Sequence, residues 1–313
     1  MPESHIYCGQ EIPLDLRQLE IIRAIAETGS FTAAGHKLHV SQSAISRQIL
    51  LLEDELKTPV FLRIGRRIRI TPAGESLLQL SHRVFQDLND TVAQISDSQE
   101  TLRGTVRILG GMTVCLYVFP TLLSELTKQH PGIDVKILSD STERCVQHLR
   151  AGSGDVALLT LPIKDADMVT VPVLQEELLV VTSAKHPLAK KRKVNAQDLS
   201  TQPFVLFEQG SNTRRVVDEF FASSGIEPRI VMETENVEIL KALVRHGLGI
   251  TIVSYQSVAR DVASGHLYCA RIDGRPLIRE TGWVYPKMSR TPRAVDEVIK
   301  AFEKVRPRLR LAP

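Results

Sequence analysis

The segment from residue 30 to residue 74 constrains the fold most, because two helix-start signals and a basic hairpin follow one another there. Ser30 and Ser41 each stand directly before apolar residues at helical spacing, which is where N-cap residues are found. An upstream amphipathic series over residues 15–28 ends at Gly29, a helix-stop signal. The segment therefore predicts three short helices, of which the second and third are joined by a tight turn.

The third predicted helix carries a polar face at its N-terminus. Gln42, Ser43, Ser46 and Arg47 lie opposite its apolar stripe, and Ser41 is placed to cap it. Amide, hydroxyl and guanidinium groups at a helix start can read base edges and bind phosphates in a major groove. This pattern predicts a recognition helix.

A basic hairpin follows this helix. Residues 60–64 and 68–71 alternate as strands do, and no carboxylate interrupts the basic residues between positions 57 and 71. These are Lys57, Arg63, Arg66, Arg67 and Arg69. Arginines on an isolated hairpin more often form a solvated face, but the position after a recognition helix favours phosphate or minor-groove contact. The two features together predict a winged helix-turn-helix.

Three stretches of this head, residues 30–34, 38–46 and 70–75, resemble the signature of the LysR-type transcriptional regulators. The resemblance implies a winged N-terminal domain, a linker helix and a two-lobed α/β effector domain of the type 2 periplasmic-binding-protein-like fold. It also implies the DNA contacts, which are Gln42, Ser43, Ser46 and Arg47 on bases and phosphates, Thr32 and Arg63 on phosphates, and Arg66 or Arg67 in the minor groove. The sequence departs from the family at Gly35, where Ala is more usual and where Gly costs a helix about 1 kcal/mol.

The expected fold class is multidomain α and α/β. We place the DNA-binding domain at residues 1–72, the linker helix at 73–103 and the effector domain at 104–313. Lobe I covers about 104–165 and 276–313, and lobe II about 166–275. Apolar residues recur at spacings of three and four over residues 77–102. Such a narrow stripe packs either on its own domain or against a second copy; we favour a dimer, and the resemblance adds tetramers.

Alternating strands and helices after residue 104 predict two open α/β lobes, beginning with a strand over 105–109 and a helix over 113–129. Ligands bind such lobes beyond the carboxyl ends of the strands. The candidate effector-binding residues at these ends are Met112, Thr113, Ser141, Thr142, Leu161, Ser211, Asn212, Thr213 and Arg214. They suit a small anionic metabolite, with Arg214 or Arg144 as countercharge, although each residue alone can be an ordinary helix cap.

The remaining features limit the other function classes. The net charge of +3 is small, and residues 1–103 hold eleven Lys/Arg against thirteen Asp/Glu, so the basic signal is local to the hairpin. We find no catalytic motif, no metal-ligand spacing and no sign of a cofactor. We expect no export signal or membrane span, and therefore a cytoplasmic protein rather than an exported solute-binding protein.

Two alternatives stay open beside an effector-controlled regulator of double-stranded DNA. Cys115 and Cys145 both fall near predicted helix starts, where thiolates are favoured, so a redox-sensing regulator is one. The other is an α/β enzyme fused to a DNA-binding head.

Overall fold

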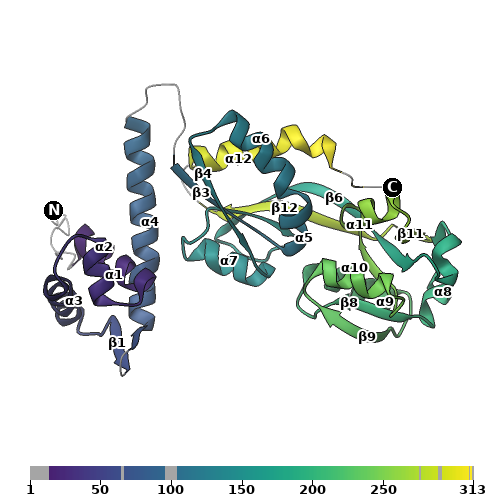
Figure 1. The fold of residues 1–313 in the computed structure, drawn as a ribbon, viewed down its shortest axis with the longest axis horizontal. Helices are drawn as coiled ribbons and strands as arrows, with labels where there is room; N and C mark the ends of the chain where they lie inside the picture. The colour runs from purple at the N-terminus through teal and green to yellow at the C-terminus, as the bar shows by residue number, and fades with distance from the viewer. Residues whose placement is uncertain are drawn as a thin grey trace, which may run out of the picture. The chain divides into compact units, whose positions relative to one another are not determined.

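The computed structural model describes residues 14–64, 67–95, 104–274, 276–287, 291–309 and 311. The chain forms two compact units, an N-terminal head that extends to residue 96 and a larger unit that contains most of the remaining chain. Figure 1 labels the helices and strands of each unit.

The head contains four helices and a hairpin among its described residues. In chain order these are α1 (Leu16–Thr28), α2 (Phe31–Lys37), α3 (Gln42–Leu56), β1 (Phe61–Ile64), β2 (Arg67–Ile70) and α4 (Pro72–Ile95). The Ser30 hydroxyl accepts from the Ala33 amide at 3.4 Å, and the Ser41 hydroxyl accepts from the Ala44 amide at 3.2 Å. Both predicted N-caps are confirmed.

The core of the head fixes which face of α3 is left exposed. Ile45, Ile49 and Leu52 on α3 are buried, and they pack with Ile22 of α1 and Ala34 of α2. The antiparallel β1–β2 hairpin closes this core. Because α3 buries its apolar stripe in the core, its opposite face is exposed.

The larger unit is an α/β structure. Its first elements are β3 (Gly104–Gly110), α5 (Met112–Tyr117), α6 (Phe119–Gln129), β4 (Ile133–Ser139), α7 (Thr142–Arg150), β5 (Val156–Thr160) and β6 (Met168–Ser183). There follow a 3₁₀ turn (Pro187–Lys190), β7 (Lys193–Val194), α8 (Ala196–Ser200), β8 (Pro203–Phe207), α9 (Asn212–Ser223), β9 (Arg229–Thr234) and α10 (Val237–Arg245). The last are β10 (Thr251–Ser254), α11 (Tyr255–Ala263), β11 (Leu267–Ile272), β12 (Ile278–Pro286), α12 (Arg293–Val305) and a 3₁₀ turn (Arg306–Arg308).

The strand pairing brings the carboxyl ends of several strands together. β3 is parallel to β4 and β5, and the register sets Gly110 beside Ser139 and Leu158. β8 is parallel to β9, with Phe207 beside Thr234. The loops that follow these paired ends therefore meet at one edge of each lobe.

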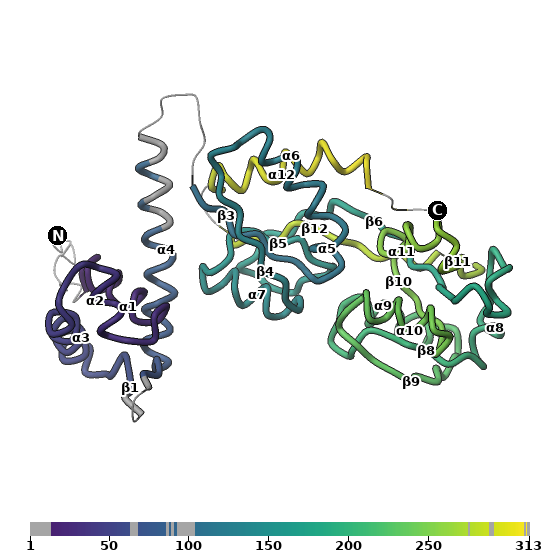
Figure 2. The backbone as a smooth tube through the Cα atoms, in the orientation of Figure 1, coloured from purple at the N-terminus to yellow at the C-terminus, as the bar shows by residue number. Residues whose placement is uncertain are grey.

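Two long strands connect the lobes. β6 and β12 pair antiparallel over most of their length, and Figure 2 shows them running from one lobe into the other. Leu174 and Trp283 belong to the lobe I core, whereas Leu178 and Leu277 pack with the lobe II core. The chain therefore passes from lobe I to lobe II after Leu174, later than the lobe boundary expected at residues 165–166. The reason is that the crossing segment is a paired strand and not a loop.

Candidate nucleic-acid interface and effector cleft

The predicted recognition residues share one face at the N-terminus of α3. Gln42 Nε2 donates to Ser46 Oγ at 2.7 Å, and the hydroxyl oxygens of Ser41 and Ser43 lie 3.0 Å apart. Four of the five are exposed, including Arg47, and Ser46 is half-buried. The structure therefore presents a row of donors and acceptors that a nucleic-acid groove can reach.

The flanking candidates lie on α2 and the hairpin. Thr32 is exposed in the first turn of α2, Arg63 lies in β1, and Arg67 begins β2. The neighbouring Arg69 side chain is exposed. Arg66 lies outside the described residues. The predicted hairpin is thus confirmed, while the individual DNA contacts remain predictions.

Gly35 has a steric role that its helix propensity conceals. A Cβ at this position would stand 2.8 Å from the carbonyl oxygen of Val40 and 3.4 Å from the amide nitrogen of Gln42. The Val40 amide also donates to the Gly35 carbonyl at 2.9 Å. The α2–α3 turn of this chain therefore packs directly on the backbone of α2 and leaves no room for a Cβ unless the turn moves.

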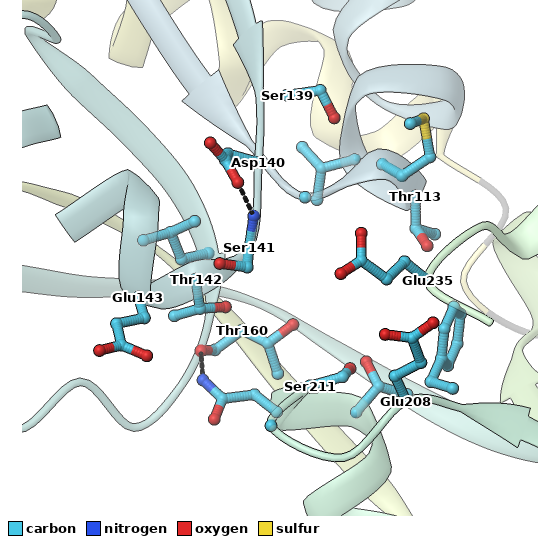
Figure 3. Close-up of a pocket in the computed structure, with 18 of the residues that line it drawn as sticks. Thr113, Ser139, Asp140, Ser141, Thr142, Glu143, Thr160, Glu208, Ser211 and Glu235 are labelled. Atoms are coloured by element: carbon cyan, nitrogen blue, oxygen red, sulfur yellow. Dashed lines mark hydrogen bonds between the residues drawn. The ribbon is translucent and has the colours of Figure 1, made fainter. Parts of the chain in front are cut away.

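A cleft of about 520 Å³ lies between the lobes, beyond the carboxyl ends of β3, β4, β5, β8 and β9 (Figure 3). Seven of the nine candidate residues line it, drawn from three separate strand ends. They are Met112, Thr113, Ser141, Thr142, Ser211, Asn212 and Thr213. Hydroxyl and amide side chains from both lobes thus face one cavity, which suits a small polar ligand.

The structure does not bring two candidates to the cleft. Leu161 is buried in the core of lobe I. Arg214 is 4% exposed, and its guanidinium donates to Phe207 O, Asp218 Oδ1 and Glu233 Oε1 at 2.7, 2.7 and 2.5 Å. Burial disfavours its charge, but the carboxylates of Glu233 and Asp218 outweigh burial and raise the pKa of Arg214. Arg214 therefore joins α9 to the ends of β8 and β9.

The prediction that Arg214 or Arg144 balances the charge of an anionic ligand in the cleft is therefore wrong. Arg144, the second candidate, is largely exposed, and its Nε lies 3.9 Å from Asp140 Oδ1. Neither Arg144 nor Arg214 is among the lining residues of the cleft. The N-terminal position of both residues on their helices suggested a role that helix orientation does not give them.

Arg279 supplies the cationic side chain that does line the cleft. It is 4% exposed, and its Nη2 lies 2.5 Å from Glu176 Oε2, so that the two charges form a buried pair. Its Nη1 donates to Thr213 Oγ1 at 2.9 Å. Sequence reasoning missed Arg279 because it lies inside an antiparallel crossing strand, away from the strand ends where ligand contacts were sought.

Four carboxylates also line the cleft, namely Asp140, Glu143, Glu208 and Glu235. Figure 3 shows Glu208 and Glu235 extending into the cavity from lobe II, on the side opposite Ser141 and Thr142. Glu208 and Glu235 each directly follow a strand. The same position after a strand end predicted Ser141 and Ser211 as ligand contacts, so Glu208 and Glu235 could have been predicted as well. They were not, because an anionic ligand was expected and carboxylates repel anions.

Hydrogen bonds join the lobes at two places. Asn212 Nδ2 donates to the carbonyl of Thr160 at 2.7 Å. At α5, the Tyr117 hydroxyl bonds Glu238, and it accepts from Lys241 Nζ at 2.8 Å. Gln256 Nε2 donates to the Tyr117 carbonyl at 2.9 Å. The described conformation of the lobes is therefore held by specific polar contacts.

The three cysteines that the structure describes, Cys115, Cys145 and Cys269, are free thiols. Burial raises the pKa of the Cys115 and Cys269 thiols, and burial together with the nearby Asp140 charge raises the pKa of Cys145 to about 12. Raised values suppress the thiolate that reacts with oxidants. Cys8 lies outside the described residues. The redox-sensing alternative is therefore disfavoured.

No cluster of three or more His, Cys, Asp or Glu side chains among the described residues could hold a metal ion. No helix in the described ranges is long and apolar enough to cross a bilayer.

Two family profiles match this chain. Residues 16–75 match the bacterial regulatory helix-turn-helix protein of the lysR family, and residues 99–306 match the LysR substrate binding domain. The sequence is 33% identical over 272 residues to the HTH-type transcriptional activator CmpR of Synechocystis sp., covering 87% of this chain and 89% of that protein. It is 31% identical to the RuBisCO operon transcriptional regulator of Allochromatium vinosum, covering 88% and 91%.

Solved structures agree with the fold. A full-length OxyR variant from Pseudomonas aeruginosa superposes with a TM-score of 0.78 at 24% identity, covering 93% of this chain and 95% of that one. Full-length CbnR in complex with its target DNA gives a TM-score of 0.67 at 24% identity, covering 93% and 99%. The winged head, the two-lobed unit and the matched profiles agree throughout, and the chain belongs to the LysR family of DNA-binding transcriptional regulators.

Proposed function

We propose that α3 enters the major groove of double-stranded DNA with Ser41, Gln42, Ser43, Ser46 and Arg47 toward the bases and phosphates. The observation that carries this proposal is the division of α3, whose apolar stripe is buried in the head while these polar side chains share the opposite face. Thr32 and the basic hairpin flank this face and add phosphate contacts.

The test begins by selecting genomic fragments with the full chain. Arg47→Ala should weaken binding to the selected site by about 1–3 kcal/mol, roughly fivefold to 150-fold, because a guanidinium contact to base or phosphate is lost. Arg17→Ala removes a charge from α1, where Arg17 pairs with Glu20, and serves as the control. Fluorescence anisotropy at fixed salt measures both. Equal affinities for Arg47→Ala and the unaltered chain would remove Arg47 from the interface.

The cleft is the proposed effector site. Thr142 at the start of α7 and Asn212 at the start of α9 both line it, so backbone N–H groups and hydroxyls of two helix starts converge there. Such donors suit an acidic group of a small metabolite. Ligand binding between the lobes would then favour one lobe arrangement and alter the pairing or spacing of the DNA-binding heads.

Thr113 is the residue to test, because it lines the cleft and its hydroxyl has no hydrogen-bond partner among the described residues. Thr113→Val should lower the affinity for a cleft ligand about tenfold and leave DNA binding unchanged. A thermal-shift screen of acidic metabolites finds the ligand, since binding to the native state raises the midpoint. Undiminished calorimetric affinity of Thr113→Val would place the ligand elsewhere.

The assembly and targets are also proposals. Paired heads would bind two half-sites of a partly palindromic operator, as dimers or as tetramers of two dimers. The name of the Allochromatium vinosum relative makes genes of the RuBisCO operon the first candidates for regulation. Sequencing the fragments that the chain selects would show whether such genes are among them.

A further inference from the structure

We infer that the ligand of the cleft carries a cationic amine as well as an acidic group, and that Glu208 and Glu235 bind the amine. The inference rests on the proposed function, because it assigns the ligand class of the same cleft. It departs from the purely anionic ligand that the sequence suggested.

The backbone places the two carboxylates side by side. Phe207 and Thr234 are register partners at the ends of the parallel strands β8 and β9, and Glu208 and Glu235 are the next residues. Neighbouring strands lie about 4.8 Å apart, so the two side chains start from adjacent positions. Figure 3 shows both extending into the cavity between the lobes, with the Glu235 carboxylate between Ser141 and Thr113 and Glu208 near Ser211. A ligand ammonium between them would contact both carboxylates.

No cationic side chain among the described residues compensates the charge of this pair. Within the described ranges neither Glu208 nor Glu235 has an ion-pair or side-chain hydrogen-bond partner, in contrast to Asp140, which lies near Arg144 and His148. The cationic side chain of the cleft, Arg279, is already paired with Glu176. Two adjacent uncompensated carboxylates repel each other, and a bound cation removes that repulsion.

A second, independent group points to the acidic end of the ligand. Thr213 lines the cleft at 5% exposure, and its hydroxyl oxygen accepts from Arg279. Among the residues that the structure describes, its hydroxyl hydrogen has no acceptor, so a buried donor is left for a ligand atom. Together with the N–H groups at the start of α9, it provides a site for a carboxylate or similar group.

The resulting ligand class is a small zwitterion of the amino-acid type. Its acidic group would lie against Thr213 and the start of α9, and its ammonium between Glu208 and Glu235. A cavity of about 520 Å³ accommodates a molecule of this size. A plain anion satisfies only the first site, and a polyol would leave the two carboxylates unneutralised.

The experiment uses matched probes on the full chain. α-Amino acids are titrated beside the α-hydroxy acids of the same skeleton, such as alanine with lactate, serine with glycerate and aspartate with malate. Calorimetry should show at least one amino acid that binds about tenfold or more tightly than its hydroxy partner, because a charge-assisted contact is worth this much. High salt should lower the affinity for the amino acid, because it screens the charges.

Three variants assign the effect. Glu208→Gln and Glu235→Gln should each lower the affinity for the amino acid about tenfold. The difference in affinity between the amino acid and its hydroxy acid should become smaller. Glu227→Gln makes the same charge change at an exposed site on lobe II that does not line the cleft, and it should have no effect.

The outcomes separate this inference from the proposed function. If hydroxy acids bind as tightly as amino acids, and Thr113→Val lowers their affinity, the inference that the ligand carries an amine is wrong. The cleft would still be the effector site. Failure of every amino acid to bind would also overturn the inference. Binding that is insensitive to Thr113→Val would contradict the proposed cleft itself.

Discussion

At the scale of the residue, Gly35 shows how packing can reverse a propensity argument. Replacing Gly35 by Ala should gain about 1 kcal/mol of helix propensity. The added Cβ would, however, lie 2.8 Å from the Val40 carbonyl, a backbone atom that can move only with the α2–α3 turn. We expect Gly35→Ala to lower the free energy of unfolding of the head by about 1–3 kcal/mol.

Thermal denaturation followed by circular dichroism tests this expectation. The control is Ala44→Gly, an exposed position on α3 where only propensity changes, with an expected loss of about 1 kcal/mol. A higher midpoint for Gly35→Ala than for the unaltered chain would show that the turn adapts without cost.

The candidate residues were predictable where local sequence controls their position. Ser41 and Ser211 cap helices, and a cap is visible as a small polar residue before an apolar series. Arg214 and Arg279 were not predictable, because the direction of a long side chain depends on which distant carboxylates lie nearby. The position of Glu235 in the cleft likewise depends on the register of β9 against β8, which the sequence does not show.

At the scale of the element, α5 links the cleft to the contact between the lobes. Thr113 in its first turn lines the cleft, and Tyr117 in its last residue bonds Glu238 and Lys241 of α10. Tyr117→Phe keeps the ring beside Lys241 but removes the hydroxyl that joins them. We expect a loss of about 1 kcal/mol in stability of the two-lobed unit and faster amide exchange in α5 and α10.

Tyr268→Phe is the matched control, because Tyr268 is 41% exposed on β11. Hydrogen exchange followed by mass spectrometry compares the two variants. If both show the exchange pattern of the unaltered chain, the Tyr117 hydroxyl does not stabilise the contact between the lobes.

The elements themselves were largely predictable, because the periods of two and 3.6 residues recur clearly in the head and in the first lobe. The helix expected over residues 113–129 is nevertheless divided into α5 and α6, with Val118 between them. The crossing strands β6 and β12 contain charged residues, which an apolar strand pattern does not predict. Glu176 and Arg279 are buried there as a pair, which a single-strand pattern cannot show.

At the scale of the whole molecule, α4 carries the prediction of self-association. Its first turns pack on the head through Leu77 and Leu78, as the alternative of packing on its own domain anticipated, and Ser81 donates to the Leu19 carbonyl at 3.0 Å. Further along, Leu88 is 40% exposed. We expect Leu88→Glu to weaken dimerisation about tenfold or more, because a charge enters the proposed helix pair.

Analytical ultracentrifugation measures this effect, and Gln79→Glu, on an exposed position of the same helix, is the control. A dimer that persists unchanged in Leu88→Glu at micromolar concentration would assign self-association to another surface.

The central claim is that occupation of the cleft changes how the heads bind DNA, and one measurement tests it directly. The affinity of the full chain for its selected DNA site is measured by anisotropy with and without the amino acid or acidic metabolite that binds most tightly, for the unaltered chain and for Thr113→Val. We predict a change of about fivefold or more in the unaltered chain, and a much smaller one in Thr113→Val at the same ligand concentration. Identical DNA affinity and an identical footprint with and without bound ligand would contradict the account.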